Sequence, residues 1–553
     1  MTFDDARRDL AGWRAEVPDD PFRADTSLRA RLQRALPAER LAALERDASR
    51  FGRAVVEEVG PAAERYEHRA HLPELARYDG IGRRIEAVRF DPDYDRAGAA
   101  VWRSGLVALS GTPGRAYEQA TLLYLLSLEG EAGHACPAVC TIGLARALRR
   151  VADPAVRDRF LPPLLETDFT RAQRGSQFLT EVQGGSDVGA NATRARPQAE
   201  GSYIVTGEKW FCSVADAQQF LVTARVPGGP DGTRGLGCFV VPRTLDGAPN
   251  GFVLRRLKEK LGTRGMASGE IDFDGARAWP IGPVEHGFRT AAGVVLNTSR
   301  WMTAIGSTGM MRRAYLEASA YARHRRAFGR AIEEFPSTRA TIAELRVAWL
   351  GALHLVFALT ELEDRIDSDT ADDETVVYHR FLVNATKYAL SVDATTAVRR
   401  AIEVLGGNGT IEDFSVLPRL YRDAIVYESW EGTHNVLVAQ VLADMHRMPI
   451  VDVVGERLGK LLRADTSPIA DRAHAELDDV LAEMHRSTAD AELGARHFRG
   501  ILDRVVLLAR VATLLEGGEH VAAEHLLRTH VLGERPERDT GYANRVDALV
   551  TSG

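Results

Sequence analysis

The sequence predicts a mainly helical protein of the α+β class, in which one β-rich segment interrupts a succession of helices. Three observations predict this class. Apolar residues recur at three- and four-residue spacing over most of the 553 residues. Short β-branched and aromatic runs, separated by Gly and Pro, are concentrated between about residues 171 and 283. Long amphipathic segments with short loops follow, which is typical of an antiparallel helix bundle.

Four domains are expected in order along the chain. Residues 1–170 should form an N-terminal helical domain, and residues 171–283 a compact antiparallel β domain or barrel. Residues 284–445 should form a four-helix bundle. Residues 446–553 should add a further helical domain, with a helix break at Ser467–Pro468.

Composition excludes several classes of protein. Hydrophobic residues make up 45%, enough for large cores, and the net charge of −7 gives no general attraction to nucleic acid. We find no run of about 18 uncharged apolar residues and therefore expect no membrane span. The charged N-terminus lacks the apolar core of a secretory signal. Together with only four cysteines, this predicts a cytoplasmic protein without a disulfide framework.

Cys136 and Cys140 lie four residues apart, beside His134. They could supply half of a metal site, but no second pair of ligands stands at a suitable spacing. We therefore expect both cysteines to be small buried residues of a helix, and we expect no metal.

The glycine-rich stretch LGGNGTIED, Leu405 to Asp413, is not a dinucleotide fingerprint. The third glycine is missing at the required offset, and the stretch follows a helix rather than a strand. Two interpretations stay open. The glycines could form the C-terminal cap of a helix, or they could let the backbone approach a cofactor closely.

The stretch TEVQGGSDV begins the β-rich segment. Its Thr180, its Ser186 and free backbone N–H groups could bind a small anion or the edge of a ring. Alternatively, Asp187 could simply close a turn by bonding to its own backbone.

The stretch GEKWFCSV is expected to be a strand. Alternation along a strand would place Phe211 and Ser213 on one face and Trp210 and Cys212 on the other. An aromatic ring and a hydroxyl on one face would suit a planar heterocycle.

The stretch ARHRRAFGR ends a long helix with four arginines. They could be a solvated basic last turn that complements the helix dipole. They could equally clamp a phosphate or pyrophosphate, for which the guanidinium fork is suited.

Together these stretches resemble the acyl-CoA dehydrogenase family of flavoproteins. Its motifs occur in the family's order as TEVQGGSD, GEKWFCS, YARHRRAFGR, LGGNG and WEGT. The Gln-Gly-Gly-Ser-Asp form and Pro336, where other members carry Gln, are most similar to the AidB subgroup of alkylation-response flavoproteins. The resemblance implies FAD bound without a Rossmann fold, and a homotetramer or homodimer.

The resemblance also implies roles for single residues. Glu431 would abstract the proton α to a carbonyl, and the flavin N5 would accept hydride from the β-carbon. Some members carry this base on an earlier helix, where Ser299 stands here. Four of the implied contacts, Arg325, Phe328, Gly406 and Gly407, would reach the FAD of a neighbouring subunit. The implied cofactor contacts are Leu179, Thr180, Gly185, Ser186, Phe211, Ser213, Arg325, Phe328, Gly406, Gly407, Trp430, Thr433 and Asn435.

The leading interpretation is an FAD-dependent α,β-desaturating dehydrogenase that acts on an acyl-CoA or an acyl-like metabolite. An electron-transfer protein or O₂ would then reoxidise the flavin. One alternative is an oxidase or monooxygenase on the same fold. Another is a DNA-associated alkylation-response protein, but residues 451–553 hold 13 Arg/Lys against 18 Asp/Glu, so we expect no DNA binding. Trp430 and His434 depart from the family's Tyr and Ser, and His434 could titrate near neutrality.

Overall fold

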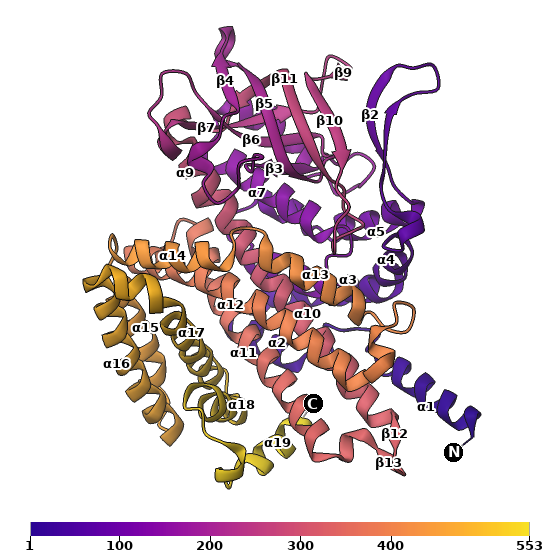
Figure 1. Cartoon of the computed structure of the whole chain (residues 1–553), viewed down its shortest axis with the longest axis vertical. Helices are drawn as coiled ribbons and strands as arrows, with labels where there is room; N and C mark the ends of the chain where they lie inside the picture. Colours follow the sequence, from indigo (N-terminus) through magenta and orange to yellow (C-terminus); the bar gives the residue numbers. More distant parts are fainter. Residues whose placement is uncertain (1, 552–553) are drawn as a thin grey trace. The chain divides into compact units, whose positions relative to one another are not determined.

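The computed structural model describes residues 2–551, and the chain forms two compact units (Figure 1). We call residues 54–302 the sheet unit, and residues 1–53 together with 303–553 the bundle unit. The chain is 63% helical and 13% strand, which confirms the mainly helical α+β class. The succession of helical, β and helical parts is confirmed as well.

A seven-stranded sheet forms the centre of the sheet unit. Its strand order is β10-β11-β5-β4-β6-β3, and β7 pairs with both β11 and β6. Most pairings are antiparallel as predicted, but β6 runs parallel to β3 and β4. The β4–β5 hairpin separates β3 from β6 in the sequence, and such a long connection allows a parallel pairing. The strands are β3 (Gly175–Phe178), β4 (Arg194–Pro197), β5 (Tyr203–Ser213), β6 (Gln219–Arg225), β7 (Leu236–Pro242), β10 (Phe252–Leu257) and β11 (Ser268–Pro280), with a small hairpin of β8 (Thr244–Leu245) and β9 (Ala248–Pro249).

The helices of the sheet unit bury apolar faces against each other and against the sheet. Helix α7 packs on β3, where Leu144 and Leu148 meet Leu179 and Leu221 in one core cluster. Every residue of α6 is buried, as expected for a helix that is apolar all round. The helices are α4 (Gly60–Tyr66), α5 (Pro92–Arg103), α6 (Ala116–Leu126), α7 (Ala135–Val151), α8 (Pro154–Phe160), α9 (Gly287–Thr290), a π-helical turn (Ala291–Leu296) and the start of α10 (Asn297–His324).

A β-hairpin interrupts the N-terminal helices, which the sequence did not lead us to expect. Strands β1 (Glu74–Tyr78) and β2 (Arg84–Arg89) pair antiparallel. The buried carboxylate of Glu86 accepts a hydrogen bond from the backbone N–H of Leu254 at 3.1 Å. Leu254 belongs to β10, which ends the strand order of the sheet. The hairpin therefore supplies a hydrogen-bond acceptor to a backbone N–H on the edge strand β10.

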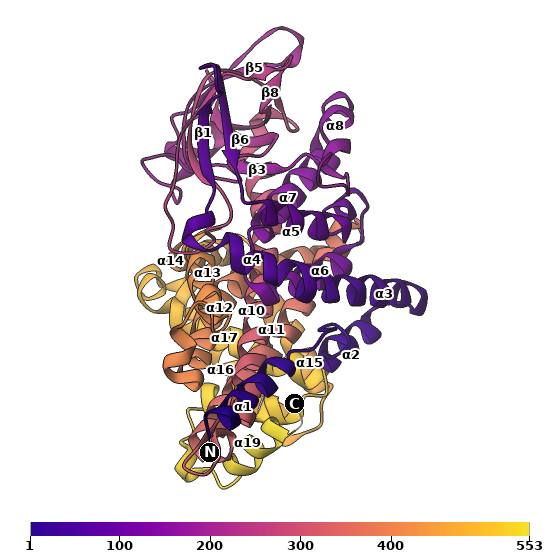
Figure 2. The same ribbon diagram turned by 90° about the vertical axis from the view of Figure 1, so that its right-hand side faces the viewer.

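Long antiparallel helices build the bundle unit, and α11, α12 and α13 lie side by side (Figure 1 and Figure 2). Their boundaries follow ordinary end signals, such as Pro336 at the start of α11 and Gly406 after α12. The elements are α1 (Phe3–Ala15), α2 (Thr26–Ala35), α3 (Ala38–Ala54), the rest of α10, β12 (Arg326–Ala327), β13 (Arg330–Ala331), α11 (Pro336–Asp367), α12 (Asp373–Leu405), α13 (Leu417–Ser429), α14 (His434–Met445), α15 (Ile450–Arg463), α16 (Pro468–Ala489), α17 (Ala491–Glu516), α18 (His520–Leu526) and α19 (Tyr542–Thr551).

Within the described residues, only α11 is long and apolar enough to pass a test for a membrane span. Its most apolar window is 83% buried inside the protein. Burial of that kind is the behaviour of a core helix in a bundle.

The first 53 residues pack with the C-terminal helices rather than with the helices that follow them in sequence. Arg31 of α2 donates to the carboxylate of Glu516 at 2.7 Å, and Ser27 donates to Glu519 at 3.0 Å. The two ends of the chain therefore share one unit. The bounds of the four domains read from the sequence stay predictions.

Candidate functional site

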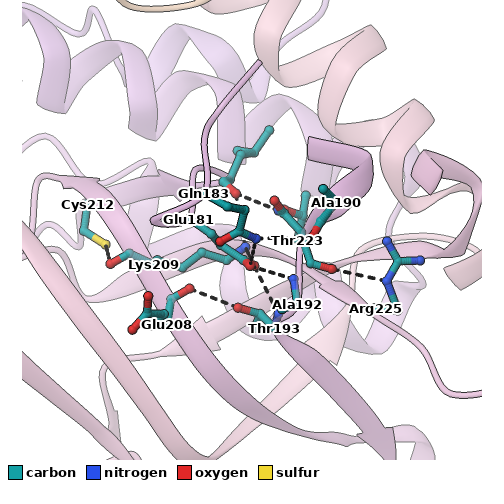
Figure 3. A network of polar contacts seen from close by, with 12 residues as sticks. Glu181, Gln183, Ala190, Ala192, Thr193, Glu208, Lys209, Cys212, Thr223 and Arg225 are labelled. Carbon is teal, nitrogen blue, oxygen red and sulfur yellow. Dashed lines mark hydrogen bonds and ion pairs between the residues drawn. The ribbon is translucent and has the colours of Figure 1, made fainter. Parts of the chain in front are cut away.

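In the sheet unit, a buried ion pair holds the loop that follows β3 (Figure 3). The Nζ of Lys209, on β5, lies 2.8 Å from Oε1 of Glu181 and donates to the carbonyl oxygen of Leu179 at 3.2 Å. The two side chains are 0% and 2% exposed. Glu181 also accepts from the backbone N–H groups of Ala192 and Thr193. The backbone at Leu179, a predicted cofactor contact, is thereby fixed from several directions.

The electrostatics of the pair favour a charged carboxylate. Burial raises the pKa of Glu181, but the Lys209 ammonium and the N–H donors outweigh burial and hold that pKa below its ordinary value. Removing one partner would leave the other charge buried and uncompensated. Sequence reasoning missed both residues. Both residues stand within motifs that were singled out, but each motif holds a second charged residue, Asp187 or Glu208, so the sequence did not mark the pair.

The predicted contacts Thr180 and Gly185 come together within one loop. The carbonyl oxygen of Thr180 accepts from the backbone N–H of Trp210 at 2.9 Å, which ties the loop to β5. A Cβ added at Gly185 would lie 2.5 Å from the Thr180 hydroxyl, so this close approach requires glycine. Ser186 is exposed beside them.

Strand β5 carries a β-bulge at Trp210 and Phe211. The register with β11 shifts between Gly269 and Ile271, so both residues lie opposite one partner. The Nζ of Lys258 lies 3.7 Å from the ring centroid of Trp210 and 4.8 Å from that of Phe211. The predicted alternation, with the two rings on opposite faces, is therefore wrong, because a bulge interrupts the two-residue period.

Phe211 and Ser213 still provide a ring and a hydroxyl close together on one strand. The ring of Phe211 is 53% exposed, which is unusual for an aromatic side chain in a sheet. Ser213 ends β5, and no described residue hydrogen-bonds its hydroxyl. An exposed ring beside an available hydroxyl is suited to stacking on a planar heterocycle and bonding to its edge.

A cavity of about 390 Å³ in the sheet unit includes Lys258 in its wall. Arg69, Lys260 and Arg264 also line it, against a single acidic residue, Glu259. Lys258 also pairs with the carboxylate of Glu270 at 2.7 Å, but basic residues still outnumber acidic ones in this wall, which would favour an anionic group.

In the bundle unit, a cavity of about 360 Å³ brings together Arg325, Gly406 and Gly407. Gly406 has a φ of 62° and caps α12, so the helix-cap interpretation of LGGNG is confirmed. A Cβ at either glycine would meet no atom within 4 Å, so this backbone faces open space. Within the described part of the chain, Arg325 has no carboxylate partner. A guanidinium beside exposed backbone suits a phosphate group.

Phe328 lies at the tip of the hairpin β12–β13, directly after this arginine-rich segment. Phe328 and Gly329 have φ values of 52° and 86°, as in a two-residue turn of type I′. The Phe328 ring is 96% exposed. A large aromatic side chain on a hairpin tip is typical of a residue that binds something outside its own unit.

The WEGT motif forms the turn between α13 and α14. Trp430 caps α13, and Thr433 is the N-cap residue of α14. Between them, Glu431 has a φ of 57° and Gly432 a φ of 99°. A left-handed conformation costs a non-glycine residue about 1–3 kcal/mol and is common at functional sites. The predicted catalytic residue is thus the strained residue of the turn.

A buried lysine holds this turn at two points. The Nζ of Lys387, on α12, donates to the carbonyl oxygens of Glu428 at 3.1 Å and of Gly432 at 3.0 Å. Lys387 is completely buried. The two acceptors flank Glu431 in sequence, so one ammonium fixes the backbone on both sides of the carboxylate. Sequence reasoning missed Lys387, because nothing in its own stretch marks it.

Aromatic rings and a histidine surround the turn. The rings of Tyr427 and Trp430 lie 4.5 Å apart, and Glu431 is half-buried. The Nε2 of His434 lies 3.4 Å from a carboxylate oxygen of Glu428, without hydrogen-bond geometry. Burial, and next the charge of Lys387, lower the pKa of His434. Neutral imidazole is therefore favoured here. The predicted contacts Thr433 and Asn435 are exposed at the start of α14.

A helical segment, a middle sheet and a helix bundle follow one another in the order found in acyl-CoA dehydrogenases, and the family matches below make the protein an FAD-dependent oxidoreductase of that type. Comparisons with known families agree. The acyl-CoA dehydrogenase C-terminal domain matches residues 285–446, and the acyl-CoA dehydrogenase middle domain matches residues 176–276. The N-terminal domain of the adaptive response protein AidB matches residues 15–171.

Individual relatives cover most of the chain. The AidB protein of Escherichia coli (strain K12) is 34% identical over 463 residues, which are 80% of this chain and 80% of that protein. Acyl-CoA dehydrogenase family member 11 of Caenorhabditis elegans is 31% identical over 80% of this chain and 73% of its own length. The crystal structure of Caenorhabditis elegans ACDH-11 in complex with C11-CoA has a TM-score of 0.85 at 25% identity, covering 97% and 91% of the two chains. The chain belongs to the acyl-CoA dehydrogenase family, and its likeness to the AidB subgroup is confirmed.

FAD is the cofactor of this family, and the residues present fit it. The sheet unit offers an exposed ring, a hydroxyl and a glycine loop, and the bundle unit offers a cavity with a guanidinium and open backbone. The individual roles assigned to the thirteen contact residues stay predictions. No group of three His, Cys, Asp or Glu side chains in the described residues is placed to hold a metal, and Cys136 and Cys140 are buried in α7.

Proposed function

We propose that this protein desaturates an acyl thioester between its α- and β-carbons, with Glu431 as the base. The observation that carries the proposal is the WEGT turn. Its carboxylate residue is held in a left-handed conformation by a buried lysine that bonds the backbone on both sides. A base must be positioned before its basicity matters, and this turn positions one carboxylate.

In this proposal the residues of the turn and those that contact it have separate roles. Glu431 removes the proton on the α-carbon. The neighbouring Tyr427 and Trp430 rings reduce access of water to the carboxylate, and Lys387 keeps the backbone in place. Bound FAD would supply the acceptor for the hydride of the β-carbon. Leu179, Thr180, Phe211 and Ser213 would hold the isoalloxazine ring, and Arg325, Gly406 and Gly407 the phosphate-bearing part of a second copy's FAD.

The substrate class is proposed from the relatives. The related ACDH-11 was crystallised with C11-CoA, and Escherichia coli AidB shares the N-terminal domain type. We infer an acyl-CoA or a similar acyl metabolite as the substrate, and a homodimer or homotetramer as the working assembly. The acidic C-terminal helices support a function without DNA. We also propose that the protein is cytoplasmic and that an external acceptor reoxidises the reduced flavin.

The test uses a single conservative substitution. Glu431→Gln should leave the yellow, FAD-loaded protein intact, because the amide keeps the size and position of the side chain. Addition of acyl-CoA substrates should no longer bleach the flavin under anaerobic conditions. Glu428→Gln is the matched control, because it removes a neighbouring carboxylate at the end of α13, before the turn, and should bleach normally. Bleaching retained in Glu431→Gln would place the base elsewhere. A wild-type protein that no acyl-CoA bleaches would refute the substrate class.

A further inference from the structure

The N-terminal helix α1 packs on the wall of the cavity that contains Arg325 and the two glycines. Trp13, near the end of α1, is only 2% exposed. Its ring stacks on Phe414, with centroids 5.1 Å apart and an interplanar angle of 19°. It also meets Tyr321 edge to face at 5.3 Å. Tyr321 lines the cavity. One tryptophan therefore supports a wall of the cavity from behind.

A second set of contacts ties the same helix to the segment that leads into the cavity. Glu16, the residue after α1, accepts a hydrogen bond from Nε of Arg323 at 2.9 Å and lies 2.6 Å from Nε2 of His324. Burial raises the pKa of Glu16, but these two partners outweigh it and keep that pKa below its ordinary value. A Cβ at Gly12 would lie 2.6 Å from the His324 ring, so helix and histidine touch closely. Arg323 and His324 immediately precede Arg325.

Tyr321, which Trp13 contacts, is in turn hydrogen-bonded to residues that line the cavity. The hydroxyl of Tyr321 accepts from Nδ2 of Asn408 at 3.1 Å, and its carbonyl oxygen accepts from the backbone N–H of Arg325 at 2.8 Å. Asn408 follows the two glycines directly and also lines the cavity. Tyr321 is thus bonded to both the arginine side and the glycine side of the cavity.

We propose that α1 is a clamp that sets the affinity of this cavity for the phosphate-bearing half of FAD. We define the clamp as Trp13 and Glu16 with their partners on α10 and at Phe414. The family regions match residues 15–171, 176–276 and 285–446, so Trp13 and most of α1 precede all three, whereas Glu16 lies just inside the first. The inference rests on the proposed function, because it takes this cavity as part of the FAD site.

The clamp does not contact the ligand. It keeps the residues of the cavity in place before the ligand binds. No residue of α1 lines the cavity itself. Without the tryptophan, Tyr321 loses the aromatic ring behind it, and the arginine and glycine segments lose a common support. The cavity must then be ordered when the ligand binds, and this ordering lowers affinity. Coupling between two ligand sites typically changes affinity by about 5- to 150-fold, and we take the lower part of that range as the scale expected here.

The experiment compares nucleotide binding by apoprotein variants in a calorimeter. Trp13→Ala should weaken FAD binding on the order of 10-fold and weaken ADP binding by a similar factor. Binding of FMN, which keeps only one of the two phosphates and lacks the adenosine, should weaken much less than binding of FAD. Trp13→Phe should restore most of the FAD affinity. Phe3→Ala is the matched control, because Phe3 lies on the same helix but is 86% exposed; it should bind like the wild type.

Thermal unfolding and the oligomeric state are measured for every variant. If Trp13→Ala fails to fold, Glu16→Gln replaces it, with a smaller loss of FAD and ADP affinity expected. Wild-type affinity for FAD and ADP in the folded variant would overturn the clamp. A loss of FMN binding equal to that of FAD would also overturn it, since the effect would not belong to this cavity. A wild-type protein that binds no FAD would instead refute the proposed function.

Discussion

Replacing Lys387 with methionine should release the turn that presents Glu431. Methionine keeps the apolar length of the side chain but removes the ammonium that donates to the carbonyl oxygens of Glu428 and Gly432. A hydrogen bond from a charged donor contributes roughly 1.5–3 kcal/mol. Two such bonds are lost, while the cost of burying an ammonium, several kcal/mol, disappears with them. The two bonds together contribute roughly 3–6 kcal/mol, and the removed burial cost offsets part of this. We take about 2–3 kcal/mol as the net destabilisation of the turn that presents Glu431.

Destabilising this turn should also lower the rate of catalysis. Glu431 occupies a left-handed conformation that costs about 1–3 kcal/mol, and Lys387 offsets that cost. Without the lysine the turn should relax, and only a small fraction of molecules would hold the carboxylate in place. At 1.36 kcal/mol for each factor of ten, kcat should fall roughly 30- to 160-fold. The variant should still bind FAD, because most of the predicted FAD contacts lie outside this turn.

Two measurements check this reasoning. Backbone amides of residues 428–434 should exchange with deuterium faster in Lys387→Met than in the wild type. The rate constant of flavin reduction by a substrate that bleaches the wild type should fall by the stated factor. Lys460→Met is the control, because Lys460 is an exposed lysine of α15. Unchanged exchange together with an unchanged reduction rate would refute a positioning role for Lys387.

Two further outcomes follow from the buried charges. Because the pKa of His434 is lowered in the native state, the unfolded chain binds its proton more readily, and stability should fall as pH drops below about 6.5. In His434→Gln this part of the pH dependence should vanish. Urea unfolding between about pH 7.5 and pH 5.5 measures it as the change in the free energy of unfolding with pH. The same change in the variant and the wild type would contradict the prediction. Lys209→Met should destabilise the sheet unit by about 3–5 kcal/mol, because it leaves Glu181 buried and unpaired. The double variant Glu181→Gln/Lys209→Met should be more stable than Lys209→Met, and additive losses in urea unfolding would count against the coupling.

The sequence predicted those features whose signals are local. The β-rich segment was visible from composition, and the helices from their apolar period. Gly406 takes the cap conformation that its place after a helix predicted. The five motifs occur in one order, and this was enough to indicate the family. In each case the structural rule depends on residues a few positions apart.

Features that depend on packing were not predictable in this way. The pair of Glu181 and Lys209 joins positions 28 residues apart, and Lys387 bonds a carbonyl 45 residues away. An amphipathic pattern shows that a helix buries one face but not which helix it meets. For this reason the sequence could not place α1 and α2 with the C-terminal helices. The bulge at Trp210 was missed because one extra residue leaves no compositional signal.

The two units position their predicted site residues by the same means. In the sheet unit the ammonium of Lys209 holds the carbonyl of Leu179, and in the bundle unit that of Lys387 holds the carbonyl of Gly432. An ammonium has three donors and no acceptor, so one buried lysine can bond several backbone or carboxylate oxygens at once. A planar guanidinium could not match these directions without moving the backbone. The motif residues are thus left to face the ligand, while lysines outside the predicted site fix their geometry. Mutations at Lys209, inside the GEKWFCS motif, and at Lys387, outside the five motifs, should therefore both disturb the geometry of the site.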